Sequence, residues 1–262
     1  MDTPKTTSGK SIFRAVNILS CIGQGATSIT DISEACNLSK ATVHRLLSVL
    51  AETRLVQYNS ITHQYLLGTL FIQFLSNPQV THAYLIRCTD GEMKHLAELT
   101  QDAVHLDIMS GMCNMLLRAI PSRHALRIVE EIGENEYFHA GATAKVLLSQ
   151  LNETDLKIAL KNIKFIPFTE NTIVHADELM VQIKRIKEQG HAVSFGERIS
   201  GAVSISVSIN NYIVPAALTV LGPQDRIRPR VNEILNEMKK SSAIISQSIQ
   251  GCLEIKKVDK SS

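Results

Sequence analysis

One amphipathic segment with a helix start signal constrains this chain more than any other feature. Ser39 is a candidate N-cap, because its hydroxyl can accept a hydrogen bond from an N–H group in the first turn of a helix. The next apolar residues recur at the spacing of one helix face, and they are Val43, Leu46, Leu47 and Leu50. No acidic residue lies between Asn37 and Ala51. The pattern predicts a helix with one buried face and one polar face that does not repel anions.

The neighbouring segments predict that this helix belongs to a winged helix-turn-helix. Residues 31–36 predict a short helix with Thr30 as its N-cap, and Asn37 suits a left-handed turn between the two helices. Two β-like segments follow at 55–58 and 64–67, joined by a polar turn. In such an arrangement the second helix presents its first turns to the major groove of DNA. The amphipathic helix alone would fit an ordinary solvated helix equally well, but the surrounding elements favour DNA binding.

The side chains expected to contact DNA are hydroxyls and bases on these helices. Such groups donate hydrogen bonds to phosphates and to base edges. The net positive charge of the chain also lies in this region, which supports DNA binding there. Residues 1–75 hold six basic and four acidic side chains, and the remainder holds 21 of each. The predicted DNA-binding residues are Arg14, Ser28, Thr30, Ser39, Lys40, Thr42, His44 and Arg45.

The length of 262 residues suits two domains. Residues 1–11 are polar and predict a disordered tail, and residues 12–76 form the expected DNA-binding domain, which opens with a helix over 12–22. The boundary is expected near Asn77-Pro78, because proline stops the helix predicted just before it. Residues 77–262 are then a linker helix, extending to about residue 100, and a second domain.

The second domain mixes strands and helices in its hydrophobic pattern. Alternation of apolar and polar residues predicts strands, and apolar residues every three or four positions predict helices. The expected strands are 104–108, 115–119, 125–129, 203–209 and 213–220. The expected helices are 142–151, 175–189 and 231–253, with Asn152 capping a further one and Gly190 ending the second. The sequence therefore predicts the α+β class.

Several classes of protein are disfavoured. No apolar run approaches the ~18 residues of a membrane span, and the first residues lack the apolar stretch of a secretory signal. Five scattered cysteines suggest reduced thiols in the cytoplasm. No nucleophile elbow, zinc-protease motif or phosphate loop is present, so we expect neither an enzyme nor a cofactor. His105, Asp107 and His139 lack the rest of a defined ligand set, so no metal site is predicted.

Residues 29–35 and 38–47 closely resemble the helix-turn-helix of the IclR family of bacterial transcription regulators. Residues 12–19 resemble the opening helix of that family, and residues 65–68 the end of its wing. The resemblance is weaker in the second half, where it rests on residues 137–145, 189–193, 197–203 and 221–226. It covers about residues 12–250 and is most specific in the first domain.

The resemblance implies a two-domain α+β protein with an N-terminal winged helix-turn-helix and a C-terminal GAF-like effector-binding domain joined by a linker helix. It implies homodimers or homotetramers on palindromic, double-stranded operator DNA, most often acting as repressors. The effectors known in the family are small molecules, often carboxylates, so we expect control of a carbon-source catabolic operon, with a sugar acid as one effector class.

Two alternatives remain. In one, the C-terminal domain only oligomerises, through the apolar residues of its terminal helix, and takes no small molecule; those residues are Val231, Ile234, Leu235, Met238 and Ile245. In the other, an enzyme carries an accessory DNA-binding domain, but the sequence offers no catalytic constellation for it.

The resemblance also places an effector pocket over the central sheet of the second domain. It assigns polar and backbone groups from three segments to that pocket, namely Ala140, Gly141, Ala142, Ser194, Ser204, Thr219 and Leu221. The first segment begins a helix, whose N–H groups suit a carboxylate. The family often has Asp and Cys where Ser194 and Ser204 stand, so we expect a less acidic pocket that binds a polyhydroxylated acid through hydroxyl contacts. The competing interpretation is that the serines line the outer face of a half-exposed strand.

Overall fold

The computed structural model describes residues 7–129, 133–135 and 138–253. The chain forms two compact units, residues 1–81 and 82–262. The division therefore falls between Thr81 and His82, close to the boundary expected at Asn77-Pro78. Each unit has its own hydrophobic core, so the two are described separately.

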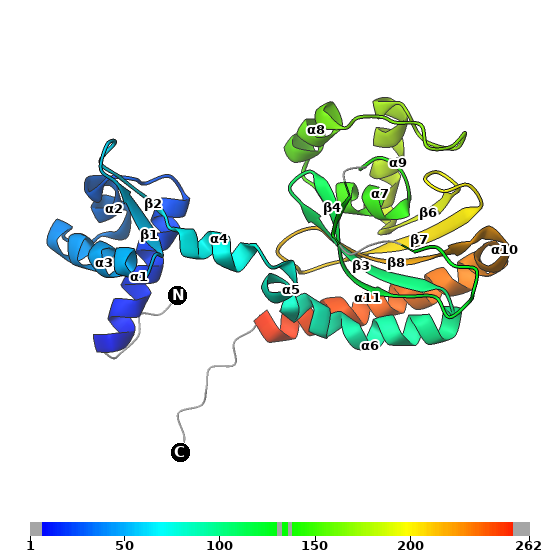
Figure 1. The fold of residues 1–262 in the computed structure, drawn as a ribbon, viewed down its shortest axis with the longest axis horizontal. Coiled ribbons are helices and arrows are strands. Elements are labelled where there is room, and N and C mark those ends of the chain that lie inside the picture. Colours follow the sequence, from blue (N-terminus) through cyan, green and yellow to red (C-terminus); the bar gives the residue numbers. More distant parts are fainter. Residues whose placement is uncertain (1–6, 130–132, 136–137, 254–262) are drawn as a thin grey trace, which may run out of the picture. The chain divides into compact units, whose positions relative to one another are not determined.

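The first unit is a small helical domain with a two-stranded hairpin (Figure 1). Its elements are α1 (Thr7–Gly23), α2 (Ile29–Cys36), α3 (Lys40–Glu52), β1 (Val56–Asn59), β2 (Gln64–Leu67), α4 (Thr69–Leu75) and α5 (Pro78–Thr81). All four apolar residues of the predicted stripe in α3 are buried, and they pack with Ile18 of α1 and Ile32 of α2. The helix-turn-helix and its wing are thus confirmed.

The helix ends differ in detail from the expectation. Ser39 caps α3 as predicted, with its Oγ accepting a hydrogen bond from the Thr42 N–H at 3.3 Å. The cap of α2 is Ser28, whose Oγ accepts from the Asp31 N–H at 3.1 Å, and Thr30 lies inside the helix. Ser28 is the residue with extended backbone before the first turn, which is the conformation that capping requires. Since α1 begins at Thr7, residues 7–11 belong to a helix, and residues 1–6 lie outside the described residues.

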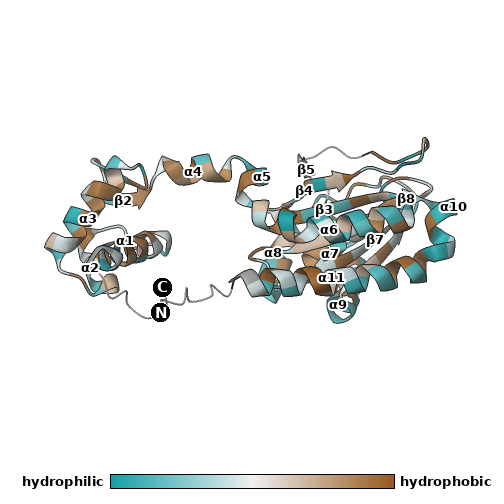
Figure 2. Cartoon of the chain, turned by 90° about the horizontal axis from the view of Figure 1, so that it is seen from below, coloured by the Kyte–Doolittle hydropathy of each residue, from teal (hydrophilic) through white to brown (hydrophobic). Residues whose placement is uncertain are grey.

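Exposed apolar side chains gather on α1 and α4 of the first unit. Figure 2 shows α4 coloured hydrophobic over most of its length, and no residue of this helix is buried. Phe74 is 57% exposed, and other exposed apolar residues of the two helices are Ile12, Val16, Ile72 and Leu75.

The second unit is built on a six-stranded sheet in which every neighbouring pair is antiparallel. The strand order is β5-β4-β3-β8-β7-β6. The strands are β3 (Ala103–Ser110), β4 (Cys113–Ile120), β5 (Gly133–Asn135), β6 (His191–Phe195), β7 (Ala202–Ile209) and β8 (Ala216–Pro223).

Helices cover both faces of this sheet (Figure 1). One face packs against α6 (Ala83–Thr100) and α11 (Val231–Leu253), and the other against α7 (Ala142–Ser149), α8 (Glu153–Asn162) and α9 (Ala176–Gln189). Two short helices, α10 (Gln224–Ile227) and η1 (Arg228–Arg230), lead into α11. This architecture confirms the α+β class. Ile234, Met238 and Ile245 of α11 are buried against the sheet of their own chain, so they are not available to a partner in the way that the oligomerisation alternative supposed.

One further expectation was confirmed except at its start, and another was wrong. The helix predicted to run from about residue 80 to residue 100 is interrupted at His82, whose backbone is not helical and whose Nδ1 hydrogen-bonds the Tyr212 hydroxyl at 2.7 Å. Residues 125–129 are not a strand. They form a loop in which the Leu126 carbonyl accepts a hydrogen bond from Arg226, the residue that also pairs with the buried Asp102. In both places a tertiary contact overrides the local pattern.

Candidate functional site

The polar face of α3 presents three basic or titratable side chains to solvent. Lys40, His44 and Arg45 are all exposed along this face. Thr42 is half-buried, and its Oγ1 lies 2.9 Å from Ser39 Oγ, within hydrogen-bond distance. The first two turns of α3 therefore offer donors of the kind that contact phosphates and base edges in helix-turn-helix proteins.

The other predicted DNA-binding residues divide into caps and exposed side chains. The hydroxyls of Ser28 and Ser39 are engaged in capping their helices, so their first role is to fix where the helices begin. Arg14 of α1 and Thr30 of α2 are exposed. The two serines were predicted as DNA contacts. The structure shows that they also have a structural role as helix caps.

The wing adds residues that the sequence analysis did not name. The side chain of Asn59 closes the β1–β2 turn by accepting hydrogen bonds from the N–H groups of Ile61 and Thr62, at 2.9 and 3.1 Å. Ile61 at the tip is 89% exposed, and the Tyr58 hydroxyl hydrogen-bonds His63 Nδ1 at 2.8 Å. In the sequence, the polar turn between the two β-like segments was the feature that could have indicated these residues.

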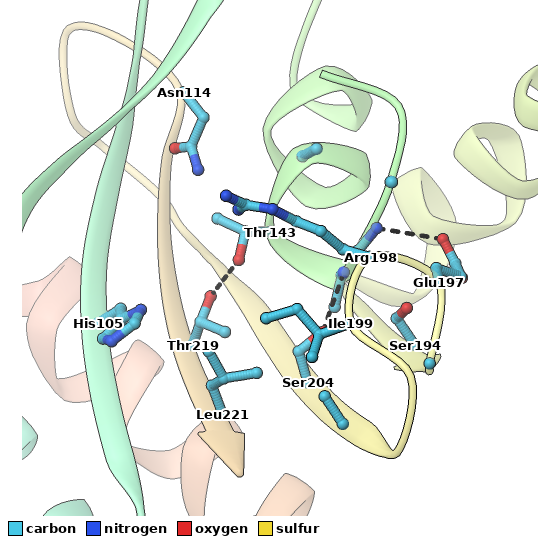
Figure 3. A pocket seen from close by; sticks show the side chains of 16 residues that line it. His105, Asn114, Thr143, Ser194, Glu197, Arg198, Ile199, Ser204, Thr219 and Leu221 are labelled. Atoms are coloured by element: carbon cyan, nitrogen blue, oxygen red, sulfur yellow. Dashed lines mark hydrogen bonds between the residues drawn. The ribbon is translucent and has the colours of Figure 1, made fainter. Parts of the chain in front are cut away.

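A cavity in the second unit gathers every predicted effector residue. The space in it that a water molecule can reach is about 50 Å³ and partly open to solvent, which is below the ~300–1,000 Å³ typical of small-molecule pockets, so the walls must move apart to admit a ligand. Its walls are the start of α7, the loop between β6 and β7, and strands from β6 across to β4 (Figure 3). The seven predicted residues all line it, and they are Ala140, Gly141, Ala142, Ser194, Ser204, Thr219 and Leu221.

The first N–H groups of α7 are already paired, contrary to the expectation that they would await a carboxylate. The Gly141 N–H donates to Glu197 Oε2 at 3.1 Å, and the Ala142 N–H donates to Ser204 Oγ at 3.2 Å. Gly141 has a φ of 91°, a conformation that side-chain-bearing residues rarely adopt, so glycine is needed here to turn its N–H toward the loop. The protein supplies its own carboxylate at the start of this helix.

Hydroxyl groups form a connected row from α7 to the pocket face of the sheet. Thr143 Oγ1 lies 2.9 Å from Thr219 Oγ1, which in turn donates to Ser206 Oγ at 3.0 Å. Ser194 and Ser206 are almost fully buried. α7 packs on the face of β7 that carries the serines, where Ser206 is fully buried and Ser204 and Ser208 are half-buried, so the interpretation of a half-exposed strand fails for Ser206.

The sequence analysis missed four polar residues that line the same cavity, namely His105, Asn114, Glu197 and Arg198. Glu197 stood in a segment that resembles the family, but nothing in its spacing indicated that its carboxylate would pair with Lys145, a buried lysine of α7. Lys145 Nζ also donates to Gln182 Oε1 of α9 at 2.9 Å. This buried pair joins the β6–β7 loop to α7 and so fixes one wall of the pocket.

In the part of the chain that the structure describes, no group of three or more His, Cys, Asp or Glu side chains is arranged to hold a metal ion. Within the same residues, no helix has the length and apolar character needed to cross a membrane.

Comparisons with known proteins agree over nearly the whole chain. Residues 11–60 match the sequence model of the IclR helix-turn-helix domain, and residues 78–247 match that of the C-terminal domain of bacterial IclR transcriptional regulators. The HTH-type transcriptional regulator KdgR of Dickeya chrysanthemi is 28% identical over 219 residues, which is 82% of this chain and 72% of that protein. The HTH-type transcriptional repressor AllR of Salmonella typhi is 26% identical over 205 residues, 78% of this chain and 75% of that protein.

Solved structures share the fold. An IclR homolog from Microbacterium hydrocarbonoxydans, crystallised in complex with 4-hydroxybenzoate, has a TM-score of 0.60 at 17% identity, covering 92% of this chain and 98% of that one. These relatives are regulators rather than enzymes. The DNA-binding fold of the first unit, the sheet of the second and the two family matches lead to one conclusion: the chain belongs to the IclR family of bacterial transcriptional regulators.

Proposed function

We propose that this protein is a ligand-responsive repressor of a carbon-source catabolic operon, in which a small polyhydroxylated carboxylate binds the second unit and modulates operator binding by the first. The observation that carries the proposal is the cavity beside α7, where all seven expected residues meet. Repression is supported by the relative named as a repressor, and an acid effector by the homolog that binds 4-hydroxybenzoate, itself a small carboxylate.

The chemistry of the cavity favours a ligand rich in hydroxyls. Thr143, Ser204 and Thr219 line it with groups that both donate and accept hydrogen bonds. Apolar side chains share the lining, and Ile199, Leu221 and four alanines can pack on the carbon atoms of such a ligand. A sugar acid would exchange its hydrogen bonds with water for similar bonds with these hydroxyls.

We further propose that the protein acts as a homodimer or homotetramer. Palindromic operators are read by paired recognition helices, one from each of two copies. The exposed apolar side chains of α1 and α4 supply a surface that a second copy would remove from water. They support oligomerisation through the first unit.

Thermal unfolding of the full-length protein with a panel of acids tests the effector half of the proposal. The panel contains gluconate, glucuronate, pyruvate and 4-hydroxybenzoate. A ligand at 100 times its dissociation constant adds about 2.7 kcal/mol to the stability. For a domain of this size that raises the unfolding midpoint by about 5–10 °C. A panel without any shift, with the protein folded, would contradict the effector and leave a DNA-binding protein whose second unit takes no small carboxylate.

A further inference from the structure

The pocket of the second unit has two chemically different ends. One end is the start of α7, where Glu197 and Ser204 lie. The other end lies across β8 and β3 at Asn114 of β4 (Figure 3). An acid with hydroxyls along its length can enter in either direction, and the groups at the two ends decide which direction is favoured.

The α7 end disfavours an anion. Its two leading N–H groups are engaged by Glu197 and Ser204, so neither is open to a ligand carboxylate without displacing a side chain. Glu197 also carries a negative charge of its own, held in place by the buried Lys145. A second carboxylate beside it would meet a like charge and would compete with Glu197 for the single ammonium group of Lys145.

The opposite end contains a cation that the loop holds in position. Among the described residues that line the pocket, Arg198 has the only side chain that is positively charged at any physiological pH. In Figure 3 its side chain extends over the pocket, with the guanidinium directed toward Asn114 and Thr143. The backbone before it is anchored, because Thr169 Oγ1 donates to the Gly196 carbonyl and Thr172 Oγ1 donates to the Glu197 carbonyl, both at 2.6 Å.

Asn114 provides an independent sign that this end awaits a ligand. Only 8% of the residue is exposed, and its Oδ1 finds no hydrogen-bond partner among the described residues. Buried polar atoms are nearly always paired, so an orphan acceptor that lines a cavity calls for a donor from the ligand. A carboxylate has no proton to donate, whereas a hydroxyl has one.

We propose that Arg198 and Asn114 form a subsite for a hydroxy acid, in which the guanidinium pairs with the ligand carboxylate and Asn114 Oδ1 accepts a hydrogen bond from a neighbouring ligand hydroxyl. The planar guanidinium can hold both carboxylate oxygens at once. The remaining hydroxyls of the ligand then lie toward Thr219 and Ser204. The inference rests on the proposed function, and it specifies which end of the pocket binds the ligand carboxylate.

Binding of matched acid and neutral ligands tests this assignment. Each acid is paired with the compound in which a CH2OH group replaces its carboxylate: gluconate with glucitol, glucuronate with glucose, pyruvate with hydroxyacetone, and 4-hydroxybenzoate with 4-hydroxybenzyl alcohol. Isothermal titration calorimetry of the full-length protein gives the affinity ratio within each pair. For the acid that binds the wild type, we expect a preference of at least tenfold over its neutral partner.

Substitutions then separate the two roles. Arg198→Gln should abolish the preference for the acid, and Arg198→Lys should retain part of it because the charge remains. Asn114→Ala should lower the affinity for the acid and for its neutral partner by the same factor, at least fivefold. The ratio of the two affinities should therefore stay unchanged. Arg185→Gln, on the exposed surface of α9, is the matched control and should change neither affinity.

The outcomes distinguish the subsite from the function on which it rests. If no acid binds the wild type, the proposed effector function is contradicted and the subsite with it. If an acid binds the wild type and Arg198→Gln equally well, only the subsite is overturned. If Arg198→Gln lowers the affinity for the acid and for its neutral partner equally, the subsite is also overturned, since Arg198 would then act through the shape of the pocket.

Discussion

Glu197 Oε2 accepts a hydrogen bond from the Gly141 N–H at 3.1 Å, across 56 residues of sequence. Through its other oxygen the same carboxylate pairs with Lys145, so the loop between β6 and β7 is fastened to α7 at two points. This wall of the pocket is consequently held in place by the protein itself, and the α7 end is already occupied by a negative charge.

Glu197→Gln should destabilise the second unit. The Lys145 side chain is 2% exposed, and removing its partner leaves a buried charge, which costs about 3–5 kcal/mol. The double variant Lys145→Met/Glu197→Gln should recover part of this loss, because it removes the charge as well. Thermal unfolding measures both. Glu233→Gln, which breaks an exposed pair with Arg230, is the control and should not move the midpoint. An unchanged midpoint in Glu197→Gln would show that the pair does not hold the loop.

Arg45→Ala should weaken operator binding at least tenfold, or about 1.4 kcal/mol, because an exposed guanidinium on the polar face of α3 is lost. Lys40→Ala should lower the slope of log affinity against log salt by about one, as expected for one phosphate contact. Fluorescence anisotropy with a DNA fragment selected by the protein from a random pool measures both effects. Arg185→Ala in the second unit is the control. Wild-type affinity for Arg45→Ala at matched salt would remove this residue from the DNA-binding surface.

Ser28→Ala and Ser39→Ala should each loosen the helix that they cap. The loss of an N-cap costs about 1 kcal/mol, which corresponds to roughly fivefold faster hydrogen exchange in the first turns of that helix. Mass spectrometry of the peptides that cover α2 and α3 reports it locally. Thr30→Ala, at the second position of α2, should have little effect. Equal effects of Thr30→Ala and Ser28→Ala would contradict the assignment of Ser28 as the cap.

His82 should make the second unit less stable as the pH falls. Burial lowers the pKa of His82 from its ordinary value near 6.5, so the folded protein binds a proton there less readily than the unfolded chain does. The stability is therefore fully present above about pH 6.5 and declines as the pH falls from there toward the pKa of the folded state. Urea unfolding between pH 7.5 and pH 5 should show a shallower decline for His82→Asn. Identical slopes for variant and wild type would rule out this contribution.

The elements of the first unit could be predicted from sequence because their determinants are local. The stripe from Val43 to Leu50 and the cap at Ser39 act within a few residues of each other, and both were confirmed. Ser28 and Thr30 are equally good cap residues by type, and only the backbone conformation decides between them. The error at the start of α2 was therefore one of position and not of kind.

The pocket could be predicted only in part. The resemblance to the family brought seven lining residues to one place, but contacts between distant segments determine what those residues do. Thr143 meets Thr219 across 76 residues, and the N–H of Ala142 meets Ser204 across 62. No periodicity or spacing encodes such pairs, so the occupied start of α7 and the position of Arg198 became visible only in the structure.

The most direct test of the account is whether an acid changes DNA binding through the pocket. Fluorescence anisotropy measures the affinity of the full-length wild type for its selected DNA fragment with and without each acid of the panel. We predict that at least one acid lowers the affinity severalfold, and that Ser204→Ala with Thr219→Val abolishes this response while the affinity without acid stays unchanged. An affinity that no acid alters, or a response that survives in the pocket variant, would contradict the account.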